Sequence, residues 1–257
     1  MGEYRHGRST KYNTMRSILI INPNSTESMT NGLRPLVDAL QFKDTAYEYF
    51  TAPSGPKSIN NESDAADSAT HCLPALQQTL SRHDAFLVAC YSHHPLVALL
   101  KDQPAIQSAR KPVTGIFEAS VSTSLQAIHP DESFGIVSTG KVWEDILTAA
   151  TAAFLGTGSE ASRRFAGVET TGLHASDLHD APVEEVRRRI KEAVKRLLGR
   201  GRVGAVCLGC AGMAGMDGMV REACVEELGE VDGKRVRIVD GVLAGVAWLQ
   251  GAVRAGY

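Results

Sequence analysis

The chain has 257 residues, of which 43% are hydrophobic and 22% charged, the balance of an ordinary globular protein. This length is enough for one large domain or two small ones with an ample core. The formal net charge of -2 gives no electrostatic reason to expect nucleic acid or an anionic membrane as a partner. No apolar run approaches the roughly 18 residues of a membrane span, so we expect no membrane partner either.

The N-terminal segment and the cysteines bear on location. Residues 1–16 are polar and basic without a hydrophobic stretch, so they do not form a secretory signal. We interpret them as a disordered leader; a short organelle-targeting segment is the alternative. The five cysteines are odd in number, which argues against a secreted disulfide framework and favours a reducing, cytoplasmic location.

Eight short β-rich runs alternate with helical patterns after the leader. Their apolar residues are continuous rather than alternating, which is typical of parallel strands covered by helices on both faces. This order predicts an α/β fold built from βαβ units. The expected strands span 17–24, 47–53, 84–92, 112–119, 133–140, 165–172, 204–212 and 235–242.

The clearest helix is predicted over 182–198. Pro182 suits its first helical position, and Gly199 follows its end. Apolar residues at helical spacing form one stripe, and the Arg and Lys residues then lie on the opposite face, which we interpret as a solvated surface. The stripe consists of Val183, Val186, Ile190, Val194 and Leu197.

The two halves of the chain repeat the same order of polar residues at strand ends. Asn22 and Cys90 follow the first and third strands, and Ser138 and Cys210 follow the corresponding strands of the second half at a similar separation. This repeat predicts two pseudo-symmetric domains, each a parallel sheet of about four strands flanked by helices. Such a pair brings the strand-end loops of both halves to an interdomain cleft.

The domain boundaries follow from the repeat. We place the first half at 17–116 and the second at 117–224. Residues from about 225–257 are expected to cross back and complete the first half, so the boundary near residue 116 is approximate.

Two cysteines carry the strongest chemical signal. Cys90 ends the apolar run DAFLVAC, and Cys210 stands at the matching place in GAVCLGC, each before a turn. Thiols that face each other across a cleft could remove a proton from one face of a carbon and return one to the other, as racemisation requires. A nearby helix N-terminus is expected to lower the pKa of such a thiol. Burial as a small hydrophobic residue is the structural alternative for either cysteine.

Cys207 and Cys210 also form a CxxC pair, which could indicate redox chemistry or zinc. An odd separation along a strand points the two side chains to opposite faces. The chain has no second CxxC, and a structural zinc site needs four ligands. We therefore predict no metal site here.

The turn after Cys90 holds further candidates. His93 and His94 are polar turn residues, ligands, or a base that activates the thiol. Tyr91 is a candidate substrate contact, and Ser92 could bind, through its backbone N–H, the oxygen that gains charge as the proton leaves.

The other strand ends add more candidates. Asn22 is expected to hydrogen-bond a substrate carbonyl or amide, and Ser138 and Thr139 stand at the equivalent place of the second half. The backbone N–H groups of Ala211 and Gly212 could share in binding the same oxygen.

Three residues are predicted helix caps or functional groups. Asn24 has a capping-box partner, Glu27, three residues later. Glu118 and Asp240 follow the fourth strand of their halves, where a carboxylate either caps a helix or contacts the substrate.

At these residues the chain resembles the Asp/Glu/hydantoin racemase superfamily, within it the hydantoin racemase branch. The resemblance covers nearly the whole chain after the leader. It is carried by INPNST at 21–26, VACYS at 88–92, GIFEAS at 115–120 and LGCAGM at 208–213.

The resemblance implies a two-domain α/β fold with the active site between the domains, two catalytic cysteines, no cofactor, and a homo-oligomer. The family's cysteines correspond to Cys90 and Cys210, and its INPN asparagine to Asn22. Many hydantoin racemases follow the first cysteine with a Gly-Asp-Pro-Gly-like turn, whereas this chain has Ser-His-His-Pro at 92–95. That departure bears on the substrate more than on the chemistry.

The resulting hypothesis is a cofactor-independent racemase that acts on a small molecule, a 5-substituted hydantoin or a relative such as allantoin. Other activities that use the same thiols remain open: amino-acid racemisation, cis–trans isomerisation and decarboxylation. A non-catalytic ligand-binding or redox-sensing protein is a different class, and so is a thiol hydrolase that pairs Cys90 with His93 or His94.

Overall fold

The computed structural model describes residues 15–156 and 163–256. Most of the predicted leader, 1–16, therefore lies outside the described residues. Met15 and Arg16 are its described members, and Arg16 already belongs to the first strand. Within the described ranges, no helix is both long and apolar enough to cross a membrane.

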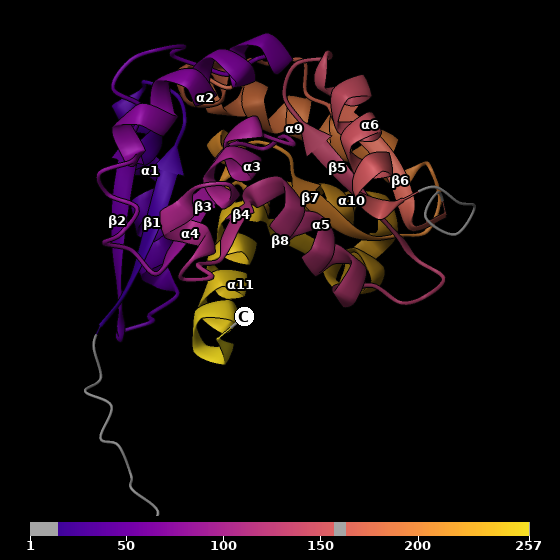
Figure 1. Ribbon diagram of the computed structural model, residues 1–257. Helices are drawn as coiled ribbons and strands as arrows, with labels where there is room; N and C mark the ends of the chain where they lie inside the picture. The colour runs from indigo at the N-terminus through magenta and orange to yellow at the C-terminus, as the bar shows by residue number, and fades with distance from the viewer. Residues whose placement is uncertain (1–14, 157–162, 257) are drawn as a thin grey trace, which may run out of the picture.

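Two four-stranded parallel sheets form the frame of the molecule (Figure 1). Both have the same strand order, β2-β1-β3-β4 in the first and β6-β5-β7-β8 in the second. This confirms the predicted α/β fold with two similar sheets. The strands are β1 (Arg16–Asn22), β2 (Thr45–Thr51), β3 (Ala85–Val88), β4 (Val113–Gly115), β5 (Ser133–Ser138), β6 (Phe165–Thr170), β7 (Val203–Leu208) and β8 (Arg237–Asp240).

Every predicted strand ends two to four residues earlier than expected, and in two of them a helix begins inside the apolar run. β4 stops at Gly115, where α5 (Ile116–Ala127) starts, and β8 stops at Asp240, where α11 (Gly241–Ala255) starts. The first turns of both helices are buried, so the sequence stays apolar across each boundary. A short apolar run does not by itself distinguish a buried strand from a buried helix.

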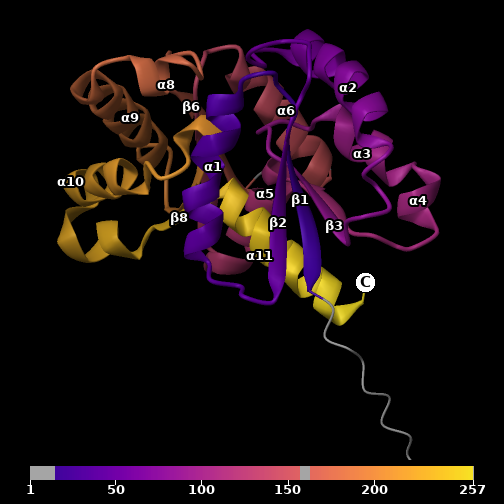
Figure 2. The same cartoon turned by 90° about the vertical axis from the view of Figure 1, so that its left-hand side faces the viewer.

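The remaining helices lie between the strands and cover the sheets (Figures 1 and 2). They are α1 (Glu27–Ala39), α2 (Glu62–Leu76), α3 (Pro95–Lys101), α4 (Pro104–Gln107), α6 (Trp143–Leu155), α8 (Asp177–Asp180), α9 (Val183–Leu198), the short 3-10 helix η1 (Ala211–Met213) and α10 (Asp217–Arg235).

The helix predicted at 182–198 is confirmed as α9, with two differences. Pro182 is the residue before the helix, and Val183 is 59% exposed because the first turn lies at the surface. The basic face is not simply solvated: Arg187 donates to Glu222 at 2.6 Å and forms part of a row of ion pairs with α10. These pairs are exposed, so each adds little stability.

The C-terminal helix links the two sheets. β8 pairs with β7 in the second sheet, whereas α11 packs against β3, β4 and α5 (Figure 2). Its Gly245 permits close contact, since a Cβ there would lie 2.5 Å from Cδ1 of Leu87. The boundaries placed at 17–116 and 117–224 stay a prediction, and α11 is the part of 225–257 that lies on the first sheet.

One hydrophobic cluster spans both sheets. It contains Ile18 and Leu87 from the first sheet and Phe134 and Ala205 from the second, all fully buried. Because the two sheets share this interior, their strand ends are held in a fixed relation to each other. That relation positions the loops of the site.

Candidate active site

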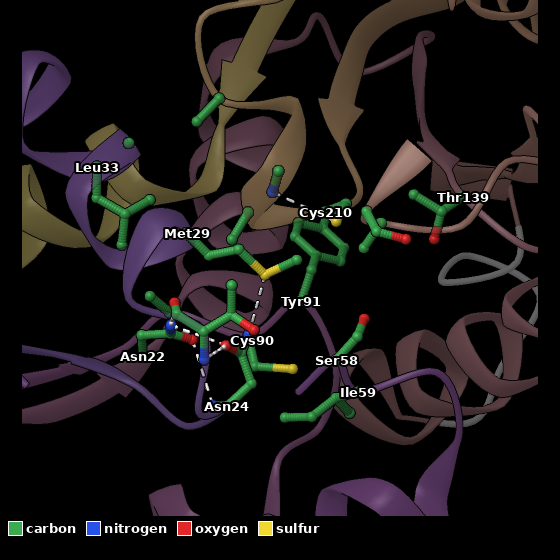
Figure 3. Close-up of a pocket in the computed structure, with 18 of the residues that line it drawn as sticks. Asn22, Asn24, Met29, Leu33, Ser58, Ile59, Cys90, Tyr91, Thr139 and Cys210 are labelled. Carbon is green, nitrogen blue, oxygen red and sulfur yellow. Dashed lines mark hydrogen bonds between the residues drawn. The ribbon is translucent and has the colours of Figure 1, made fainter. Parts of the chain in front are cut away.

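One pocket of about 370 Å³ lies where strand-end loops of both sheets meet (Figure 3). Cys90, after β3, and Cys210, after β7, both line it and approach it from opposite sides. Other parts of its wall come from α1 and from the loop between β6 and α9. Most of the predicted contacts line this pocket: Asn22, Cys90, Tyr91, Thr139, Cys210, Ala211 and Gly212. Three predicted contacts, Ser92, Ser138 and Glu118, do not line it.

The Cys90 thiol is half-buried and has a single hydroxyl near it, Oγ of Ser92 at 3.6 Å. The pKa of Cys90 is raised to about 12, chiefly by burial and to a smaller extent by the negative charges of a Cys210 thiolate and of Glu118. The Ser92 hydroxyl opposes this rise. The expected lowering of the pKa is therefore wrong for Cys90, because desolvation of a thiolate outweighs the nearby dipoles.

The Cys210 thiol has a different set of neighbours. Cys210 is the N-cap of η1, and its Sγ accepts a hydrogen bond from the backbone N–H of Gly212 at 3.3 Å. Burial raises the pKa of this thiol as well, so the expectation of a lowered pKa is wrong here too. The N–H groups of Gly212 and Met213 act in the opposite direction and favour the thiolate.

Neither histidine of the first turn contacts the thiol. The buried His94 is the N-cap of α3: its Nδ1 accepts from the N–H of Leu96 at 3.2 Å, and its Nε2 pairs with Oγ of Ser68 at 3.0 Å. Burial lowers the pKa of His94 to about 4. His93 is exposed and lies 3.2 Å from the carboxylate of Glu118. Both are turn residues, as one of the open alternatives predicted.

The amide of Asn22 is used within its own loop. Its Nδ2 donates to Oγ1 of Thr30 and Oδ1 of Asn24, both at 3.0 Å, and to the carbonyl of Thr26 at 3.2 Å. These bonds hold the loop that leads into α1, while the residue still lines the pocket. The predicted cap at Asn24 is wrong: α1 begins after Thr26, and Asn24 instead accepts from the N–H of Thr26 at 2.9 Å.

In the second sheet, Ser138 and Thr139 stand at the positions that correspond to Asn22, and one holds a loop while the other lines the pocket. Ser138 donates to the carbonyl of Gly209 at 2.7 Å and so ties β5 to the Cys210 turn. Thr139 is buried and reaches the pocket. Tyr91 lines it with its ring, since its hydroxyl lies 2.7 Å from Oγ of Ser120 in the interior.

The two candidate carboxylates also differ. Glu118 is mostly buried behind Cys90, and burial raises its pKa, while the pairing with His93 lowers it. Gly115 makes room for it, because a Cβ there would lie 2.3 Å from Oε2 of Glu118. Asp240 caps α11 through Oδ1, which accepts from the N–H of Val242 at 2.7 Å and of Leu243 at 3.2 Å.

The other cysteine of the CxxC pair points away from the pocket. Cys207 is fully buried in the shared core, with its Sγ 3.1 Å from Oγ of Ser124. Cys210, two residues beyond the end of β7, lines the pocket, so the two thiols point to different sides, as predicted. Across residues 15–156 and 163–256, no three His, Cys, Asp or Glu side chains converge as a metal site would require.

Several pocket residues were missed by the sequence reasoning. Met29 on α1, Trp143 on α6, and Ser176 and Asp180 between β6 and α9 all line the pocket. The last two lie in the connection that follows the carboxyl end of β6, and Asn22 lies at the carboxyl end of β1. That shared position is a signal that could have identified them.

Comparison with known proteins agrees with this architecture. The Asp/Glu/Hydantoin racemase family model matches residues 18–249. An uncharacterized protein of Schizosaccharomyces pombe is 35% identical over 93% of this chain and 93% of its own length. A hydantoin racemase of Pseudomonas sp. (strain NS671) is 29% identical over 93% of this chain and 86% of its own. The solved structure of an allantoin racemase from Klebsiella pneumoniae has a TM-score of 0.74 and 26% identity, covering 94% of this chain and 89% of that one.

The fold and the shared motifs thus place the molecule in a class of racemases and isomerases. The chain belongs to the Asp/Glu/hydantoin racemase family. This confirms the resemblance drawn from the sequence motifs.

Proposed function

We propose that this protein is a cofactor-independent racemase of a 5-substituted hydantoin or a related ureide such as allantoin. The observation that carries the proposal is the pair of thiols, Cys90 and Cys210, which come from equivalent strand ends of two sheets and line one pocket. The relatives that are hydantoin and allantoin racemases support the same substrate class.

The charge of the pocket wall favours a ring over a free amino acid. None of the described residues that line it is Lys, Arg or His, and Asp180 is the carboxylate among them. A substrate α-carboxylate would lose water there without gaining a cation, which is costly. A hydantoin ring is neutral and presents amide groups that backbone and hydroxyl groups can bind.

The proposed reaction is a proton exchange at C5 of the ring. Cys210, as thiolate, takes the C5 proton and becomes a thiol, and the electron pair moves onto the adjacent carbonyl oxygen as an enolate. Cys90, as thiol, gives its proton to the opposite face of C5 and becomes the thiolate. The roles reverse for the other enantiomer, so atoms and charge balance over one turnover.

The enolate oxygen needs donors as its charge grows. Ala211 and Thr139 line the pocket together with Cys210, and the N–H of Ala211 and the hydroxyl of Thr139 are the proposed donors. The N–H of Gly212 is instead assigned to the sulfur of Cys210, to which it donates. Asn22 is assigned an indirect role, since its amide already holds the loop into α1. Ser92 and Ser138 are assigned to the thiol and the turn that they contact.

Because the pKa values of both thiols are raised, we can predict in which direction kcat/KM changes with pH. In the free protein, both groups are mostly protonated near neutral pH, whereas the reaction needs one thiolate. The thiolate fraction grows as pH rises, so kcat/KM is expected to increase toward alkaline pH.

The test is racemisation of a single enantiomer in heavy water. Purified protein is incubated with one enantiomer of a 5-substituted hydantoin, and separately of allantoin, while optical rotation and deuterium at C5 are followed against the spontaneous rate. Cys90→Ser and Cys210→Ser are each expected to lower kcat by about 1000-fold or more, because each removes one of two required proton carriers. Cys224→Ala, a buried cysteine on α10, is the control that keeps both thiols.

Two results would overturn the proposal. No exchange above background on either compound would redirect attention to amino acids and unsaturated diacids. Full activity in Cys210→Ser with a burst of acylation at Cys90 would instead indicate a thiol hydrolase. That class is disfavoured by the geometry of His93 and His94, neither of which contacts Cys90.

A further inference from the structure

One carboxyl side chain among the described pocket residues has no part in the proton exchange. Asp180, at the end of α8, lines the pocket that holds Cys90 and Cys210. It is exposed, and no described side chain forms a hydrogen bond or an ion pair with its carboxylate. A carboxylate of this kind is available to a bound molecule.

The segment that carries Asp180 is fastened beside the second thiol. Its start is held by Asp177, whose Oδ2 accepts from the N–H of His174 at 2.8 Å. Leu178 is buried against the Cys210 turn: a Cβ on Gly212 would lie 3.3 Å from Cδ1 of Leu178 and 3.4 Å from the carbonyl of Ala175. The position of the carboxylate is therefore set by packing.

The rest of the described wall combines neutral polar side chains with apolar ones and holds no other carboxylate and no Lys, Arg or His. Met29, Leu33 and Ile59, labelled in Figure 3, are apolar and contribute shape and contact area, as does Trp143. Alkyl groups gain nothing from a carboxylate, and anionic groups are repelled by it. Groups with N–H donors form charge-assisted hydrogen bonds to it, which are stronger than neutral ones.

A ureido group matches a carboxylate in geometry as well as charge. Its two nitrogens direct parallel N–H bonds away from the carbonyl, and two parallel donors fit the two oxygens of one carboxylate. Allantoin carries this group on C5, where an alkylhydantoin carries only hydrocarbon.

We propose that Asp180 determines substrate preference by binding N–H donors on the C5 substituent, an inference that rests on the proposed function. Ureido-substituted rings are then preferred to alkyl-substituted ones. The reacting carbon is held between the thiols in either case. Asp180 is thus a specificity residue rather than a catalytic one.

The test compares kcat/KM for three single-enantiomer substrates in wild type, Asp180→Ala and Asp180→Asn. The substrates are allantoin, 5-isobutylhydantoin and 5-(4-aminobutyl)hydantoin, whose substituents are ureido, apolar and cationic. Glu184→Gln, on the exposed first turn of α9, is the matched charge control. Thermal melting of each variant checks that it is folded.

Asp180→Ala is expected to lower kcat/KM for allantoin by about tenfold or more and to leave the value for 5-isobutylhydantoin within about twofold. Asp180→Asn keeps one acceptor and should fall between. A loss confined to the aminobutyl substrate would overturn the ureido assignment in favour of cation selection. Equal losses on all substrates, or none, would overturn the role of Asp180 while the proposed function stands. A wild type inactive on every substrate would overturn the proposed function and this inference with it.

Discussion

The two cysteine turns occupy equivalent places in equivalent sheets, yet they are built differently. After β3, Cys90 leads into a turn that is closed by a buried histidine, His94, as the cap of α3. After β7, Cys210 is itself the cap of a 3-10 helix made of small residues, with Gly212 donating to its sulfur. The repeat of the fold explains where the thiols lie, whereas the turns decide how each thiol is solvated and charged.

The difference assigns a resting state to the pair. Cys210 receives backbone N–H groups, which favour the thiolate. Cys90 has one distant hydroxyl and feels the negative charge of Glu118, which favours the thiol. We therefore expect Cys210 to lose its proton first. The arrangement needed for catalysis, one thiolate and one thiol, then follows from local structure.

The largest expected effect concerns the pH dependence of the protein's folding stability, through His94 in the turn after Cys90. Burial lowers the pKa of His94 from 6.5 to about 4. Between these values the unfolded state binds more protons than the folded one, so stability is complete above about pH 6.5 and falls as pH decreases toward 4. The loss attributable to His94 is up to about 3 kcal/mol at pH 4.

His94→Asn should remove much of that pH dependence, since asparagine also caps a helix and does not titrate. Urea unfolding of wild type and variant at pH 7 and pH 4.5 measures it, with His93→Asn as the exposed control. An unchanged difference between the two pH values in His94→Asn would assign the acid lability to another group.

The next effect is the order in which the thiols react. If Cys210 ionises first, iodoacetamide should alkylate it about tenfold faster than Cys90 near pH 8, because alkylation follows the thiolate fraction. Mass spectrometry of peptides after timed quenching gives both rates from one sample, and the buried Cys224 reports any unfolding. Faster labelling of Cys90 would reverse the assigned resting state.

A smaller effect is expected from Glu118→Gln. The substitution removes the carboxylate whose charge raises the pKa of Cys90, so that pKa should fall. The pH at which Cys90 reacts half-maximally should shift downward, and that of Cys210 should not. His93→Gln keeps the carboxylate and serves as the control. If it reproduces the shift, the turn rather than the charge is responsible.

Much of this architecture could be predicted from the sequence because strands that are buried on both faces have continuous apolar sequences. The continuous apolar runs identified all eight strands, and their repeat placed Cys90 and Cys210 at matching ends. The boundaries at Gly115 and Asp240 could not be read, since each helix that follows begins with buried residues.

The chemical properties of the site could be predicted less well from the sequence. The sign of the thiol pKa shifts depends on desolvation by residues distant in sequence, and a single helix terminus nearby was a poor guide to it. The self-contained bonds of Asn22 depend on where Thr30 falls on α1. Asp180 lines the pocket from the short helix α8, and only its place after the end of β6, with no periodicity of the sequence, indicates this position.

The last expected effect concerns the hydroxyl beside Cys90. Oγ of Ser92 lies 3.6 Å from the sulfur and opposes the rise in the pKa of Cys90. In Ser92→Ala this pKa should rise further, and alkylation of Cys90 at fixed pH should slow by about two- to fivefold, as expected for one weak neutral hydrogen bond. Ser58→Ala is the matched control, because Ser58 lines the same pocket and bonds to Asn60 instead of a thiol. Cys210 contacts neither serine hydroxyl, so its rate should be unchanged in both variants. A slower Cys210 in Ser92→Ala would mean that the two turns are coupled through the pocket rather than tuned separately.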